Sequence, residues 1–207
     1  MKRQVAQMML DDSDIKLKPI NVLQLVIPID FFKEHVEFSW EEWCWGLESQ
    51  YVTNQMLVDE ATVRILQDEQ LDDTFYLLAA VFKDELDQVP SIIQEMREKD
   101  VIKRDLWHDE KNVLACKNKY LYVALLWLFD HLGEDYVSKD MGRIEAIRYD
   151  LMLYELIWDF RTPSDIAEYM REMVITYEVT EKNKHHFIKI WADYLREYEQ
   201  FIQEMPR

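Results

Sequence analysis

The chain has 207 residues and a mass of 25.2 kDa, which is the size of one domain. Its 41 acidic residues outnumber 24 lysines and arginines, so the formal charge is −17. This sign excludes nucleic acid or an anionic membrane as the main direct partner, because binding to phosphate needs clustered cations. Aromatic residues make up 13% of the chain, a share that argues against disorder.

Turn-forming residues and cysteines are scarce. Only 3 glycines and 5 prolines occur, which favours an all-α fold because β folds need many tight turns. Cys44 and Cys116 form no CxxC motif, so a reducing compartment is the simpler interpretation. No signal peptide is visible, and no apolar run approaches the roughly 20 residues of a membrane span. We therefore expect a cytoplasmic protein.

The first quarter of the chain predicts an arm followed by helices. Residues 19–28 are β-branched and bounded by prolines, which fits a short strand, a buried extended arm or a helix. Residues 30–36 predict one or two helical turns. Ser39 and Glu42 have capping-box spacing, so a helix is expected to begin there and to run to about Ser49.

Two further helices have polar residues at their expected beginnings. Thr53 or Asn54 caps the first, and Asp72 or Asp73 caps the second. Apolar residues at helical spacing predict that the second helix continues well beyond residue 80, with a buried stripe of Phe75, Leu78, Ala79, Phe82 and Leu86.

The strongest helix prediction lies in the middle of the chain. A helix over 91–99 follows Pro90, and a longer one covers 109–132. The segment 120–129 is apolar on every side, which predicts a central, buried helix. Later helices are expected over 140–158, over 165–174 and from Thr180 or Asn183 through Ile202.

The predicted architecture is all-α, a compact bundle of about eight helices around the helix near 110–132. We expect a single domain over 1–207. It would comprise an N-terminal arm over 1–28, a core over 29–175 and a long C-terminal helix over 176–207.

Catalytic and metal-binding patterns are weak. The histidines match neither HExxH nor the paired Glu-x-x-His of di-iron bundles, so His108 and His131 are interpreted as surface histidines beside acids. Cys44 lies between two tryptophans and is expected to be inert, while Lys117 and Lys119 would favour a thiolate at Cys116. Three glycines cannot build a phosphate loop. We expect no enzyme activity, no cofactor and no metal.

The seven tryptophans are interpreted mainly as core residues. Five of them fall on apolar helical stripes: Trp40, Trp43, Trp127, Trp158 and Trp191. Trp45 and Trp107 lie off these stripes and are expected to be exposed or at an interface.

Negative charge is concentrated in one quarter of the chain. Residues 59–110 hold 15 acidic and 6 basic residues. Two interpretations stay open, a solvated surface or a docking face for a basic protein. The partner-binding candidates are Asp68, Glu69, Asp72, Asp73, Asp84, Glu85 and Asp87.

Three segments carry a family resemblance. They are Asp30-Phe-Phe continuing to Phe38-Ser-Trp-Glu-Glu-Trp-x-x-Gly46-Leu, the apolar stretch 119–129, and the segment 144–170. Over about 30–175 the chain resembles a bacterial all-helical family of domains of unknown function. Such families are similar to those found beside polymorphic or contact-dependent toxins, where small acidic cytoplasmic proteins act as immunity factors. The resemblance transfers no catalytic residue, and residues 1–28 and those after 176 lie outside it.

The leading hypothesis is an immunity protein that binds and neutralises a toxin domain of the nuclease type. One alternative is a phage-type inhibitor or nucleic-acid mimic of a host nuclease or polymerase. Others are a helical enzyme with a dispersed site and an oligomer built through exposed aromatics. The sequence leaves the oligomeric state open.

Overall fold

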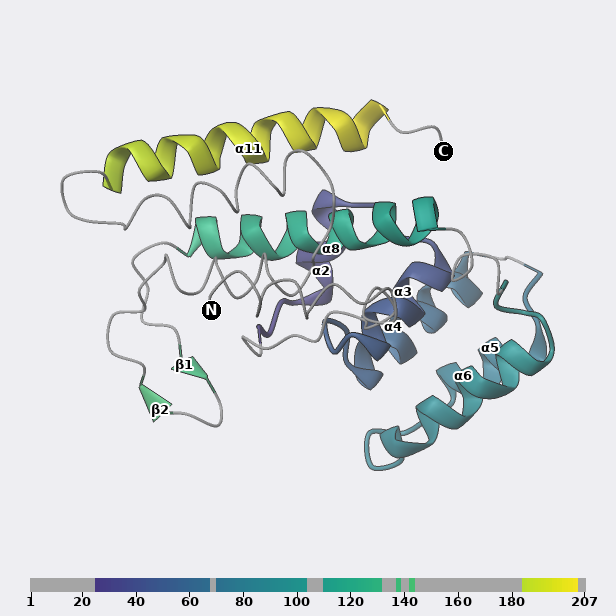
Figure 1. Ribbon diagram of the computed structural model, residues 1–207. Helices are drawn as coiled ribbons and strands as arrows, with labels where there is room; N and C mark the ends of the chain where they lie inside the picture. The colour runs from purple at the N-terminus through teal and green to yellow at the C-terminus, as the bar shows by residue number, and fades with distance from the viewer. Residues whose placement is uncertain are drawn as a thin grey trace, which may run out of the picture.

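The computed structural model describes residues 25–67, 70–103, 110–131, 137–138, 142–143 and 184–204. These residues form seven α-helices and one 3₁₀ turn: α2 (Ile29–His35), α3 (Trp40–Glu48), α4 (Asn54–Leu66), α5 (Asp73–Ala79), η2 (Leu86–Gln88), α6 (Val89–Glu98), α8 (Glu110–Asp130) and α11 (Lys184–Glu204). The fold is all-α, as predicted. Helix α8 runs through the middle, with α11 along one side and α3 and α4 on the other (Figure 1).

The predicted beginnings of α3, α4, α5 and α6 are confirmed. Ser39 and Glu42 form the capping box of α3, with the Ser39 amide donating to Glu42 Oε2 at 2.8 Å and the Glu42 amide donating to Ser39 Oγ at 3.2 Å. Thr53, rather than Asn54, caps α4, and Asp72, rather than Asp73, caps α5. Pro90 lies in the first turn of α6. Each cap satisfies a backbone amide that would otherwise lack a partner.

Tyr120 of α8 is the centre of an aromatic cluster. Its side chain is fully buried, and its hydroxyl donates to the Glu42 carbonyl of α3 at 3.0 Å. Four ring centroids lie within 6 Å of its own, at 4.7 Å for Phe38, 5.3 Å for Trp45, 5.8 Å for Phe32 and 5.9 Å for Tyr51. The prediction of a central buried helix is confirmed, because every residue from Tyr120 to Leu125 is buried.

Gly46 makes the close approach of α3 and α8 possible. A Cβ atom at this position would lie 2.5 Å from Tyr120 Cζ and 2.7 Å from Val52 Cγ2, closer than real Cβ contacts allow. The glycine is therefore required by the packing, although glycine weakens a helix interior.

Helix α11 extends the same core. Trp191, Tyr194, Leu195 and Tyr198 are buried and belong to the hydrophobic cluster that includes α8. The Tyr198 ring lies 5.3 Å from Tyr122, and the Trp191 ring meets Phe129 edge-on at 5.4 Å. The predicted apolar stripe of the final helix is thus its packing face against α8.

Two predictions about apolar side chains are wrong. Helix α5 ends at Ala79, and Phe82 lies beyond it with 71% of its surface exposed. A helix continuing to Leu86 would place Asp84 and Glu85 at its negative C-terminal end, which the helix dipole disfavours. Trp45 is fully buried rather than exposed, because α3 is enclosed on nearly all sides and the indole packs on Tyr120. Trp107 lies outside the described residues.

The helix predicted over 140–158 is wrong at its beginning. Residues Gly142–Arg143 form strand β2, which pairs antiparallel with β1 at Val137–Ser138. Gly142 costs a helix about 1 kcal/mol relative to alanine, so local pairing competes there. The rest of 140–158, the helix over 165–174 and the arm over 1–24 lie outside the described residues. Residues 25–28 have no regular secondary structure, and Leu25 and Ile27 are buried.

Substituting Gly46→Ala should destabilise the fold by about 1–3 kcal/mol, the range typical of overpacked cores. The added methyl group has no space beside Tyr120, and this steric cost exceeds the gain in helix propensity. Urea unfolding followed by far-ultraviolet circular dichroism measures the effect. The control is Ser91→Ala on the exposed side of α6, which should leave the midpoint nearly unchanged. An unchanged midpoint for Gly46→Ala would contradict the packing argument.

Candidate functional site

Five of the seven acidic residues proposed for partner binding are described, and all five are exposed: Asp72, Asp73, Asp84, Glu85 and Asp87. We call these five residues the acidic surface. Asp72 and Asp73 lie where α5 begins, whereas the other three follow α5 in the turn and in η2. Asp68 and Glu69 lie outside the described residues.

The acidic surface has two groups rather than one. Helix α5 separates them, and its seven residues span about 10 Å at 1.5 Å per residue. The first group lies near the C-terminal end of α6. Hydrogen bonds from Thr74 are the main cause of the lowered pKa of Asp72, and the charge of nearby Lys99 acts in the same direction. The second lies near the beginning of α4, since the Asn54 side-chain amide donates to the Leu86 carbonyl at 2.8 Å. A partner that contacts both acidic groups must therefore extend along α5.

Acidic residues closer to the core are neutralised by cations. Glu42 accepts from Lys119 Nζ at 2.8 Å, which joins α3 to α8. Glu60 receives Lys33 Nζ at 2.8 Å and Arg64 Nε at 2.9 Å, which joins α2 to α4. Glu48 pairs with Arg97, which joins α3 to α6.

No residue of the acidic surface forms an ion pair with another described residue. The contrast with the core acids divides the carboxylates into two kinds. Those beside the core hold helices together, and those on the acidic surface leave their charge to solvent or to a partner.

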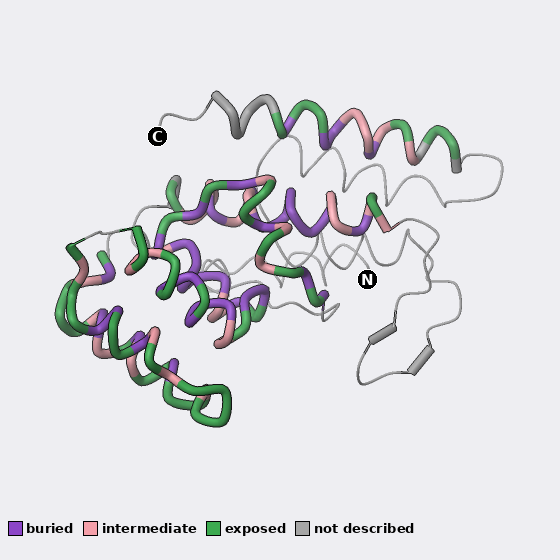
Figure 2. The backbone as a smooth tube through the Cα atoms, turned by 180° about the vertical axis from the view of Figure 1, so that it is seen from behind, coloured by how far each residue is buried: buried purple, intermediate pink, exposed green. Residues whose placement is uncertain are grey.

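Exposed apolar side chains accompany the acidic surface. Six large hydrophobic residues in the described part of the chain are exposed, and five of them belong to α4, α5 and the turn after α5: Val63, Leu66, Tyr76, Leu77 and Phe82. Figure 2 shows the long exposed stretches over this part of the molecule. Sequence reasoning missed this surface. It places Phe82 on the buried stripe of its helix, and it does not single out the other four residues, which lie off the predicted stripes.

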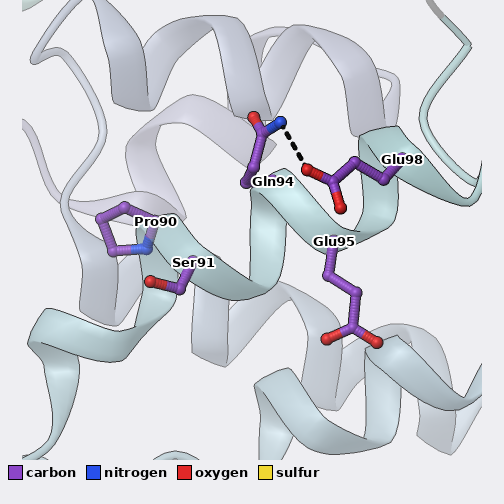
Figure 3. A pocket seen from close by; sticks show the side chains of 5 residues that line it. All are labelled: Pro90, Ser91, Gln94, Glu95 and Glu98. Carbon is purple, nitrogen blue, oxygen red and sulfur yellow. Dashed lines mark hydrogen bonds between the residues drawn. The ribbon is translucent and has the colours of Figure 1, made fainter.

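A depression on the outer side of α6 is lined mainly by polar residues (Figure 3). Its residues are Pro90, Ser91, Gln94, Glu95 and Glu98. The Gln94 amide donates to Glu98 at 3.1 Å, and Glu95 pairs with Lys99 at 2.6 Å. Small-molecule sites are usually enclosed and apolar, so this open depression does not indicate a ligand pocket.

The two thiols lie in the core rather than at a reactive site. Cys44 and Cys116 are both fully buried. Burial raises the pKa of each thiol, and at Cys116 this outweighs the opposing effect of Lys117 and Lys119. The described residues contain no group of three or more His, Cys, Asp or Glu arranged to hold a metal ion. None of the described helices is long and apolar enough to cross a membrane.

One comparison with known proteins identifies a family. The model described as "Uncharacterized protein conserved in bacteria (DUF2247)" matches residues 29–199. The chain belongs to this bacterial family. The match confirms that the resemblance seen over about 30–175 is to a bacterial family of unknown function, and it includes most of α11. The DUF2247 description names no link to toxin immunity, so that part stays a prediction. No curated protein and no solved structure matches the chain.

Asp72 should make stability depend on pH. The Thr74 hydroxyl and amide donate to Asp72 Oδ1 at 2.7 and 2.9 Å, and these bonds lower the pKa of the carboxyl. Such a group stabilises the fold fully above its unfolded pKa of about 3.9, and the contribution is lost as pH falls through the folded value. In thermal melts, the wild-type protein should have a higher melting temperature than Asp72→Asn at pH 7. This difference should disappear as the pH falls below about 4.

A second variant separates the hydrogen bonds from the cap itself. Thr74→Val removes the hydroxyl donor and keeps the amide donor. The drop in its melting temperature between pH 7 and pH 3 should therefore lie between the drops of wild type and Asp72→Asn. Parallel pH profiles for all three proteins would contradict the assignment.

Proposed function

We propose that this protein binds a basic protein partner through the acidic surface, as an immunity protein that neutralises a toxin domain of the nuclease type. One observation carries the proposal. The five exposed carboxylates at the two ends of α5 form no ion pair with a described residue, whereas the acids beside the core do. The resemblance stated from the sequence, to families similar to those found beside bacterial toxins, suggests a toxin as the basic partner.

Electrostatics gives the proposal its physical basis. Enzymes that cleave nucleic acid need basic clefts to bind phosphate, so an acidic protein is their natural complement. Such complementarity raises association rates and selects partners more than it adds affinity. The Debye length is about 8 Å at physiological ionic strength, close to the length of α5. Each group should therefore attract cations locally, and binding should weaken with salt.

The arrangement favours a protein-binding surface over a mimic of nucleic acid. A mimic needs carboxylates spaced like successive phosphates. Here the exposed apolar residues Tyr76 and Leu77 lie on α5, between the two acidic groups. Apolar area among charges is typical of protein interfaces.

Growth rescue tests the proposal. The tagged chain would capture proteins from its native bacterium at low salt, and those released at high salt would be identified by mass spectrometry. Each basic candidate would then be expressed in a laboratory bacterium. We expect one candidate to arrest growth and co-expression of this chain to restore it.

Charge reversal links the rescue to the acidic surface. Asp84→Lys, Glu85→Lys and Asp87→Lys together should weaken binding to the captured toxin at least tenfold and abolish rescue. The control triple reverses three exposed acids elsewhere, Glu34, Asp130 and Glu197, with the same change in net charge. It should rescue like wild type. If the two triple variants bind and rescue equally well, the surface assignment is wrong. If none of the captured candidates arrests growth, the immunity proposal is wrong.

A further inference from the structure

The exposed apolar residues of α4, α5 and the following turn form the most unusual surface of the described chain. We call Val63, Leu66, Tyr76, Leu77 and Phe82 the apolar surface. Leu66 is 79% exposed, Phe82 71% and Leu77 51%. Apolar side chains gathered on a surface and rimmed by polar groups commonly mark an interaction site.

Helix packing places these residues along one helical hairpin. Helices α4 and α5 are consecutive and pack directly against each other. Val63 and Leu66 lie one turn apart at the end of α4, and Tyr76 and Leu77 are neighbours on α5. Phe82 follows the end of α5. The apolar surface therefore extends over the length of α5, with acidic residues at both of its ends.

The surrounding charge selects the occupant. A second copy of this chain in a symmetric contact would bring the acidic groups of both copies together, which like-charge repulsion disfavours. An anionic lipid surface would be repelled for the same reason. Two cations lie near the first part of this surface: Arg64, which is paired with Glu60, and Lys99, which is close to Asp72 and Asp73. From residue 65 to residue 88 the sequence has one further cation, Lys83, against seven acids on the two sides of α5. Cationic residues around an apolar stripe would complement this pattern.

We infer that the apolar surface binds an amphipathic basic helix of a partner protein. This inference rests on the proposed function and specifies how the same surface engages its partner. Apolar residues at i, i+3, i+4 and i+7 of a helix span about 10 Å, which matches the length of α5. Lysines or arginines beyond both ends of that stripe reach the two acidic groups. The apolar contacts supply most of the affinity, and the charges supply orientation and rate.

A synthetic peptide tests the inference without the natural partner. The probe is an 18-residue helical peptide with leucines at i, i+3, i+4 and i+7, with lysines on the flanking positions and with a fluorophore. Its control has the same composition in an order that removes the apolar stripe. Fluorescence anisotropy at low salt should show the amphipathic peptide binding at least tenfold more tightly than the control peptide.

Matched protein variants locate the contact. Leu77→Ser and Phe82→Ser change exposed residues and should leave the fold intact, and each should raise the Kd for the amphipathic peptide at least fivefold. Val26→Ser changes an equally exposed apolar residue outside the hairpin and should leave the Kd within twofold of wild type. The Asp84, Glu85 and Asp87 reversal should raise the Kd and reduce its salt dependence.

Other results would overturn the inference in distinguishable ways. If Leu77→Ser and Phe82→Ser leave the Kd unchanged while the acid reversal raises it, the apolar surface is not the binding site, and the proposed function stands. A wild-type dimer in analytical ultracentrifugation that Phe82→Ser dissociates would make a second copy the occupant. Equal affinity for the amphipathic and control peptides would also refute an amphipathic helix as the ligand.

Discussion

The contact between Tyr120 and helix α3 is the constraint on which the rest of the structure depends. The phenol lies closer to α3 than a residue with a Cβ atom at position 46 would permit, and its hydroxyl donates to the Glu42 carbonyl. The same turn of α3 carries the Glu42 carboxylate, which holds Lys119 one residue before the tyrosine. Aromatic rings from α2, α3 and their connections then surround one side chain. Moving α8 away from α3 would disrupt all of these contacts together.

Charge in this molecule has two separate uses. Glu42, Glu48 and Glu60 each hold a cation from another helix, and they lie partly or fully in the interior, where an unpaired charge is costly. The carboxylates around α5 face solvent and tolerate the lack of an ion-pair partner among the described residues, because water screens them. An acidic protein can therefore be internally neutral at its helix contacts while its net charge resides on the outside. Substitutions of the solvent-facing acids can therefore alter the surface charge without breaking the ion pairs that join the core helices.

Local signals in the sequence predicted local structure well. The side chains of Ser39, Thr53 and Asp72 satisfy amides three or fewer residues away, so their effect is visible in the sequence. The burial of Trp45 was misjudged because it depends on which other helices pack against α3. The exposure of Phe82 was misjudged because it depends on where α5 ends. The five described acids were correctly expected to be exposed, but their division into two groups depends on where α5 ends. The apolar surface was missed partly because Phe82 fits the stripe of a helix that continues past residue 80, whereas α5 ends at Ala79.

The buried tryptophans have a consequence for spectroscopy. Trp40, Trp43, Trp45 and Trp191 are all buried, and the first three lie within one helix beside Tyr120. Their indoles emit from an apolar environment, so unfolding of α3 or separation of α11 from α8 should move the emission of these four tryptophans to longer wavelength. None of these four belongs to the acidic or the apolar surface. Trp43, Trp45 and Trp191 therefore monitor the core, whereas Trp40, whose ring packs on Phe75 of α5 at 4.9 Å, also responds to a movement of that helix.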